Sequence, residues 1–192
     1  MRHSVIEAEI AAIRSAARIL DTAEFQELTD RLWRGEGKLI VTGIGKSAIA
    51  ARKIAATCAT CNIPAVFVDP VGLFHGELGL VVSGDIVLML SNSGETEELV
   101  RLIPPLREKN CSVFSLVGRP SSTLGNQTHA MVTGVETEPF LKVPTASSAA
   151  AVAIGDALAI EVARRSGYNA AAFARNHPGG HIGRTLQQEL GA

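Results

Sequence analysis

Two short segments carry hydroxyl groups, glycine and charged side chains at a spacing that suits the binding of a phosphorylated small molecule. The first is Ser91-Asn92-Ser93-Gly94-Glu95-Thr96, followed by Glu97 and Glu98, and the second is Pro144-Thr145-Ala146-Ser147-Ser148. Hydroxyls and free backbone N–H groups at a helix start bind anions without basic residues. Taken alone, the first segment fits an ordinary helix cap with acidic first-turn residues equally well. Two such segments in one chain favour the binding interpretation.

A third segment, Gly43-Ile44-Gly45-Lys46-Ser47-Ala48, admits three interpretations. A P-loop needs glycine where Ile40 stands, so nucleoside-triphosphate hydrolysis is disfavoured. A relaxed dinucleotide fingerprint fits, with Asp69 as the ribose-binding acid. A turn whose amides, Lys46 and Ser47 approach a small phosphorylated ligand fits as well. A lysine at a helix start is electrostatically unfavourable, which favours a functional role for Lys46. This segment alone leaves the last two interpretations open.

Composition indicates one globular domain and narrows the function classes. The chain has 192 residues, of which 46% are hydrophobic and 19% charged, with a formal net charge of −1. Disorder is excluded, and without a basic cluster we expect no nucleic-acid partner. The small-apolar stretch at 146–163 contains Asp156 and Glu161, and the amino terminus lacks an apolar signal region. We therefore expect no membrane partner, a cytoplasmic location and reduced cysteines, including the Cys58/Cys61 pair.

The elements that must position these segments are an alternation of strands and helices. Continuous apolar strands separated by crossover-length segments indicate a parallel sheet covered on both faces. We predict one domain over 1–192, a three-layer α/β/α sandwich (Rossmann-like) with a five-stranded parallel sheet. An amino-terminal helical pair (1–35) is expected to precede the α/β core and the carboxyl-terminal helices (38–192). The expected strands are 39–42, 65–68, 86–90, 113–117 and 130–135, and the expected core helices are 47–60, 73–81, 96–108, 121–126, 147–166, 169–176 and 180–190.

The amino-terminal pair has its own start signals. Ser4 and Glu7 match a capping box, so the first helix is expected to begin there and to end near Asp21. The second is expected to begin at Asp21, with Glu24 in its first turn. Its buried stripe is Phe25, Leu28 and Leu32, and it is expected to stop at 35–37.

Four motifs together resemble the sugar isomerase (SIS) domain of arabinose-5-phosphate isomerases, in the form that lacks CBS domains. They are Gly43-Ile44-Gly45-Lys46-Ser47, Phe74-His75-Gly76-Glu77-Leu78-Gly79, Ser91-Asn92-Ser93-Gly94-Glu95-Thr96 and His177-Pro178-Gly179-Gly180-His181-Ile182-Gly183-Arg184. The serine-rich turn marks only the broad domain, whereas the last motif is far more specific to the isomerase group. The resemblance runs from Leu39 to Leu186.

The resemblance implies reversible conversion of D-arabinose 5-phosphate and D-ribulose 5-phosphate, supplying the synthesis of Kdo. Such a reaction needs a base and a proton shuttle but no metal or redox cofactor. Local physics leaves Glu95, Glu97 and Glu98 open as the base, and the resemblance selects Glu98. It also implies proton-transfer or ring-opening roles for His75 and His177, with Lys46 holding negative charge or sugar hydroxyls. The substrate and phosphate contacts are then expected from Gly45, Ser47, Ser91, Asn92, Ser93, Thr96, Ser147 and Ser148.

The resemblance also implies an oligomer, expected to be a homotetramer in which His177 enters the site of a neighbouring subunit. The sequence departs from the family at Asp69 and across the loop 136–143, which lacks the usual cysteine, and these departures bear on sugar specificity. We expect a lone catalytic-type domain without nucleotide-binding appendages. A phosphosugar-sensing module, an isomerase of another sugar phosphate and a dinucleotide-dependent oxidoreductase are the alternatives. A sensor needs the hydroxyl turn but not the acid–base set.

Overall fold

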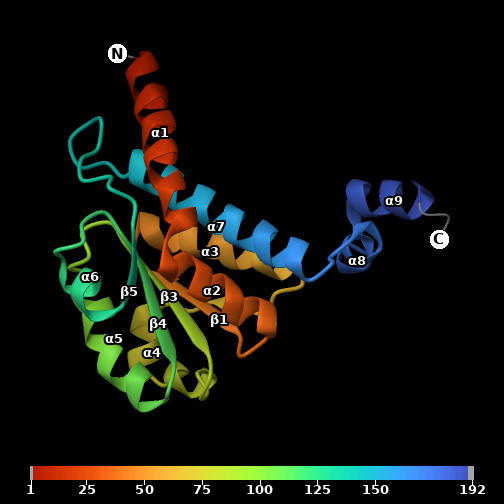
Figure 1. Cartoon of the computed structure of the whole chain (residues 1–192), viewed down its shortest axis with the longest axis horizontal. Helices are drawn as coiled ribbons and strands as arrows, with labels where there is room; N and C mark the ends of the chain where they lie inside the picture. Colours follow the sequence, from red (N-terminus) through yellow and green to blue (C-terminus); the bar gives the residue numbers. More distant parts are fainter. Residues whose placement is uncertain (1, 190–192) are drawn as a thin grey trace.

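The computed structural model describes residues 2–189, which form a five-stranded, wholly parallel sheet packed between helices (Figure 1). Its strand order is β2-β1-β3-β4-β5, which confirms the predicted three-layer fold. The strands are β1 (Leu39–Gly43), β2 (Ala65–Phe67), β3 (Ile86–Ser91), β4 (Ser112–Val117) and β5 (His129–Val132). Strand β5 ends before the predicted residue 135 because the chain turns at Gly134, where φ is +70°.

Each face of the sheet has its own helical layer and its own core (Figure 1). One face is covered by α1 (Arg2–Ala16), the 3₁₀ turn η1 (Ala17–Asp21), α2 (Ala23–Arg34), α3 (Lys46–Thr60) and α7 (Ala146–Arg165). The other is covered by α4 (Pro70–Phe74), the 3₁₀ turn η2 (Glu77–Leu80), α5 (Glu97–Glu108) and α6 (Thr123–Gln127). Side chains alternate along each strand, so that Leu88 packs in the first core and Met89 in the second. The near-continuous apolar strands therefore serve two buried faces.

The predicted starts of the amino-terminal helices are wrong. Helix α1 begins at Arg2, so Ser4 lies in its first turn rather than at the N-cap. Asp21 ends η1, and the N-cap of α2 is Thr22, whose hydroxyl accepts a hydrogen bond from the backbone N–H of Phe25 at 3.3 Å. Thr22 has the extended backbone that an N-cap needs, whereas Asp21 is still in the 3₁₀ turn.

The buried stripe of α2 is confirmed at Phe25, Leu28 and Leu32, and the helix ends at Gly35. Glycine is favoured there because φ is +67°.

The predicted helix 73–81 is also wrong, because it is divided into α4 and η2. Gly76 lies between them with φ of +110°, a conformation that cannot continue a helix. Asp69 is the N-cap of α4, and Pro70 sits at its first position, so the helix begins earlier than predicted.

The other helices agree with the prediction to within one or two residues. Two further helices, α8 (Ala170–Asn176) and α9 (Gly180–Glu189), follow α7. The predicted end at Leu190 lies outside the described residues.

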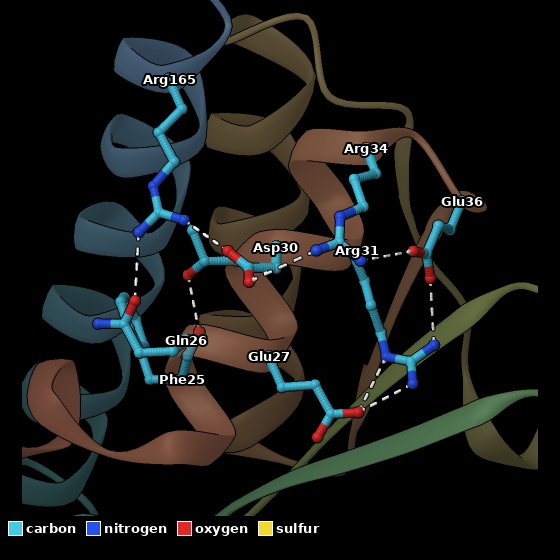
Figure 2. Close-up of polar contacts among 9 residues, drawn as sticks. Phe25, Gln26, Glu27, Asp30, Arg31, Arg34, Glu36 and Arg165 are labelled. Carbon is cyan, nitrogen blue, oxygen red and sulfur yellow. Dashed lines mark hydrogen bonds and ion pairs between the residues drawn. The ribbon is translucent and has the colours of Figure 1, made fainter.

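Helix α2 is tied to the end of α7 by a polar network (Figure 2). The guanidinium of Arg165 donates to Asp30 at 2.6 Å and to Gln26 at 3.2 Å. On the other side of α2, Arg31 bridges Glu27 at 2.8 Å and Glu36 at 3.2 Å. These partly exposed pairs orient α2 more than they stabilise it.

Helix α7 is long and apolar enough, by length and composition, to cross a membrane. In the fold it packs against α1, α2 and α3, and half of its apolar window is buried. Gly155 on α7 faces Ile54 on α3 so closely that any Cβ would overlap the isoleucine side chain. The small residues of α7 therefore allow close helix packing inside the chain.

Candidate active site

A cleft opens at the carboxyl edge of the sheet, over the ends of β3 and β4 and between the starts of α3 and α7. Beside it, β1 and β3 are neighbours although β2 separates them in sequence, and Gly43 pairs with Leu90 at their ends. The crossover connections diverge at this point, and open parallel sheets bind ligands there. The cleft is lined by Ser47, Ala50, Leu90, Ser91, Asn92, Leu116, Thr133, Ser147, Ser148 and Ala151. Three of the predicted ligand segments thus contribute to a single hollow.

The turn at residues 91–96 is organised by its own hydroxyl groups. The Oγ of Ser91 lies 2.8 Å from Thr96 Oγ1 and accepts from the Gly94 N–H at 3.1 Å. The Oγ of Ser93 accepts from the Glu95 N–H at 3.2 Å. Gly94 has φ of +69°, and a Cβ there would overlap Ser122. The hydroxyls are therefore gathered ahead of the first turn of α5, where its free N–H groups favour an anion.

The structure separates the three acids that sequence reasoning left open. Glu95 accepts hydrogen bonds from the Thr123 N–H at 2.8 Å and the Thr123 hydroxyl at 2.6 Å. The hydroxyl and N–H of Thr123 hold the pKa of Glu95 below its ordinary value. Glu97 is 82% exposed and lies 3.9 Å from Arg101. Glu98 is half-buried at the second position of α5. Its carboxylate makes no hydrogen bond and no ion pair with residues 2–189.

The turn after β1 places Lys46 next to Ser47, which lines the cleft. Gly45, with φ of +61°, precedes α3, and Lys46 is the first residue of that helix and is exposed. Ser47 lines the cleft, whereas a Cβ on Gly43 would come within 3.1 Å of the Leu90 carbonyl. Glycine at 43 thus permits the close approach of this turn to β3.

His75 is exposed at the carboxyl end of α4. Its neighbour Phe74 lies beneath the guanidinium of Arg101 on α5, with 5.0 Å between the charge and the ring centroid. This contact holds the end of α4 beside α5, one turn from Glu98. Asp69, the candidate ribose-binding acid, accepts from the Val71 N–H at 2.9 Å as the cap of α4. That role weakens the dinucleotide interpretation.

His177 lies away from the cleft of its own chain. Helix α7 starts at the cleft and its 20 residues span about 30 Å, and α8 and α9 follow its far end (Figure 1). The His177 ring stacks on Phe173 with 4.0 Å between centroids, and Nδ1 lies 2.9 Å from the Phe173 carbonyl oxygen. A Cβ on Gly183 would overlap the His177 carbonyl. One chain therefore does not bring His177 and Glu98 together.

Sequence reasoning missed Glu138, which lies at the start of α7. Its carboxylate accepts from the N–H groups of Thr145 at 3.0 Å, Ala146 at 2.9 Å and Ser147 at 3.2 Å. It also accepts from the hydroxyls of Thr145 and Ser147. Burial raises the pKa of Glu138, but these hydrogen bonds outweigh it and hold the pKa below its ordinary value. An acid shortly before a hydroxyl-rich helix start was the available signal.

The predicted contacts Ser147 and Ser148 both line the cleft. The Ser147 hydroxyl donates to Glu138, and the Ser148 hydroxyl donates to the Pro144 carbonyl at 3.3 Å. Each hydroxyl has one proton, so both side chains are left with lone pairs as their free hydrogen-bonding capacity.

Cys58 and Cys61 form no disulfide, and both thiols are buried. Burial, with Cys61 and Asp156 nearby, raises the pKa of Cys58 to about 12. A thiol that stays protonated is a poor nucleophile, so the arrangement favours a structural role.

Comparison with known proteins matches residues 32–161 to the SIS domain. An arabinose 5-phosphate isomerase KdsD of Pseudomonas aeruginosa is 39% identical over 173 residues, covering 88% of this chain and 52% of that protein. An arabinose 5-phosphate isomerase GutQ of Escherichia coli K12 is 42% identical over 158 residues, covering 81% and 49% respectively. The chain thus spans about half the length of these curated relatives.

One similar solved structure matches this chain over most of the length of both chains. The Escherichia coli CFT073 protein c3406 in complex with arabinose 5-phosphate superposes with a TM-score of 0.82 at 31% identity. The match covers 92% of this chain and 95% of that one.

Proposed function

Because the chain belongs to the SIS domain family, we propose that it is an aldose–ketose isomerase that interconverts D-arabinose 5-phosphate and D-ribulose 5-phosphate. The observation that carries the proposal is the half-buried carboxylate of Glu98, which makes no hydrogen bond or ion pair with the described residues and directly follows the hydroxyl-rich turn at the carboxyl end of β3. Relatives named arabinose 5-phosphate isomerase support it, as does the solved complex of a similar protein with arabinose 5-phosphate.

The proposed chemistry moves one proton between neighbouring carbons. Glu98 removes the proton from C2 of the open-chain aldose, the electron pair forms the C1=C2 bond, and O1 becomes negatively charged. The proton then returns to C1, the O2 proton leaves as the C2=O bond forms, and O1 takes up a proton to become the C1 hydroxyl, giving the ketose. Lys46 stabilises the charge on the enediolate oxygens, and His75 and His177 carry oxygen-bound protons and assist ring opening. No atom or electron is exchanged with a cofactor.

The remaining contacts hold the substrate. The 5-phosphate binds the amides and hydroxyls at the two turns after β1 and β3, and the sugar end faces the start of α7. The residues proposed to contact substrate are Gly45, Ser47, Ser91, Asn92, Ser93, Thr96, Ser147 and Ser148.

We propose that the active unit is a homotetramer in which His177 reaches the cleft of another subunit. The support is its position beyond the far end of α7 within its own chain. The proposed setting is the cytoplasm, in the synthesis of Kdo for surface polysaccharide.

Incubation of the purified protein with D-arabinose 5-phosphate, followed by a ketose assay, tests the function. Turnover without added metal or nicotinamide is the expected result. Binding of the sugar phosphate without ketose formation would replace the isomerase with a sensing module. No binding at all would overturn both.

A further inference from the structure

Glu138 is an anion supplied by the chain itself, and it occupies the start of the longest helix of the described residues. Three consecutive N–H groups, one from the N-cap and two from the first turn of α7, converge on its carboxylate together with two hydroxyls. Thr145, the N-cap residue, makes no side-chain cap bond of its own. A helix start with this many converging donors is otherwise suited to a phosphate. The carboxylate therefore fills the place that a ligand's dianion would take.

This arrangement also sets the hydrogen-bonding direction of Ser147. The residue is only 6% exposed and lines the cleft, and its single hydroxyl proton is donated to Glu138. The Ser147 oxygen is therefore left with two lone pairs on the cleft. These repel a phosphate oxygen but accept a hydrogen bond from a sugar hydroxyl. A second negative charge placed beside the carboxylate would be repelled as well.

The turn at 91–96 offers the opposite chemistry on the same cleft. Ser91 and Ser147 both line it, but no carboxylate blocks the hydroxyl cluster or the first amides of α5 in the described residues. Glu95, the one acid within that turn, is hydrogen-bonded to Thr123. The start of α7 is thus filled by a carboxylate, whereas the start of α5 is free of one among the described residues.

We propose that Glu138 is a positioning residue that closes the start of α7 to phosphate and presents Ser147 as an acceptor, so that a sugar phosphate binds in one direction only. This inference rests on the proposed function for the identity of the ligand. It assigns the phosphate to the turns after β1 and β3, which include residues 91–96, and the sugar hydroxyls to α7. Glu138 acts through the helix and Ser147, without touching the reacting atoms.

The test measures binding of inorganic phosphate to the full chain by isothermal titration calorimetry. Glu138→Ala exposes the α7 donors and removes the charge, so this variant is expected to bind one phosphate more per chain than the wild type. Glu138→Asp retains the charge and is expected to keep the wild-type stoichiometry. Glu136→Ala removes an exposed carboxylate of the same loop and is the matched control, also expected to behave as wild type.

Unchanged phosphate stoichiometry and affinity in Glu138→Ala would overturn the proposal. If that variant fails to fold, as judged by thermal unfolding, Glu138→Ser replaces it, because the short side chain loses the charge and leaves the start of α7 open. The same additional phosphate is expected, and its absence in a folded Ser variant would refute the inference.

Kinetics provide a second readout that loss of structure would not produce. Reversed, unproductive binding in Glu138→Ala lowers kcat and KM by the same factor and leaves kcat/KM near the wild-type value. A fall in kcat/KM with KM unchanged contradicts the proposal. The phosphate titration does not depend on turnover, so failure of the isomerase assay alone would not change its outcome.

Discussion

The carboxylate of Glu95 accepts hydrogen bonds from both the backbone N–H and the hydroxyl of Thr123, at 2.8 and 2.6 Å. It therefore links the turn after β3 to the start of α6. Three acids lie within or directly after the serine-rich turn, and this pairing gives the first of them a structural role. The charge that remains half-buried and unpaired among the described residues is on Glu98.

Replacing Glu98 is expected to remove catalysis but not binding. Glu98→Gln should lower kcat by about 10²- to 10⁴-fold while leaving phosphate binding within about twofold of wild type. A steady-state ketose assay and calorimetry with inorganic phosphate measure the two effects. Glu97→Gln, at an exposed position on the same turn of helix, is the matched control and should retain wild-type kcat. Full activity in Glu98→Gln would exclude it as the base.

The Glu95–Thr123 contact predicts a pH-dependent stability. The pKa of Glu95 is lowered in the folded chain, chiefly by the Thr123 hydroxyl and N–H, so its contribution is present above the unfolded-state pKa. It is lost as pH falls through the lowered, folded-state value. Glu95→Gln should therefore have a lower Tm than wild type at pH 7, and the difference should shrink below about pH 4.

Thermal unfolding across this pH range measures the effect. Thr123→Val serves as the partner variant, and the double variant should be no less stable than the worse single one, since both remove one interaction. A Tm difference that grows in acid would contradict the assignment.

A mixing experiment can decide whether His177 acts between subunits. His177→Asn and Glu98→Gln should each be inactive alone, since each removes an acid–base group worth about 10²- to 10⁴-fold in rate. When the two are unfolded together and refolded, mixed oligomers should regain activity because some clefts combine an intact Glu98 with a neighbour's intact His177. Each variant refolded alone is the control. Mixtures that stay inactive while forming mixed oligomers would place both residues in one chain's site.

The contact between α3 and α7 predicts a stability effect at Gly155. A methyl group there would overlap the fully buried Ile54 side chain, so Gly155→Ala should destabilise the fold by about 1–3 kcal/mol despite the better helix propensity of alanine. Urea unfolding measures the change. Gly79→Ala is the control, since a Cβ there meets no atom within 4 Å. Equal stability of both variants would show that the helices separate without cost.

The sequence by itself determined the layers, the strands and the chemistry at the turns. Five continuous apolar runs must be buried on both faces, and a parallel sheet with crossover helices is the arrangement that achieves this. The hydroxyl turn, Lys46 and the acids after β3 were recognisable because their residue types carry their chemistry. The helix starts at Ser4 and Asp21, and the helix 73–81, were misjudged because caps depend on local backbone angles that tertiary contacts select.

Only the tertiary structure decided which residues meet. Because β1 and β3 are neighbours in the sheet, Ser47 and Ser91 line the same cleft. His177 lies away from this cleft because the 20-residue helix α7 comes before it. The tertiary structure also places Glu95 in a hydrogen bond with Thr123, and Glu138 in hydrogen bonds with the start of α7. A carboxylate's role depends on which donors surround it in space, and residues distant in the chain supply those donors. No local pattern in the sequence shows which donors will surround a given carboxylate.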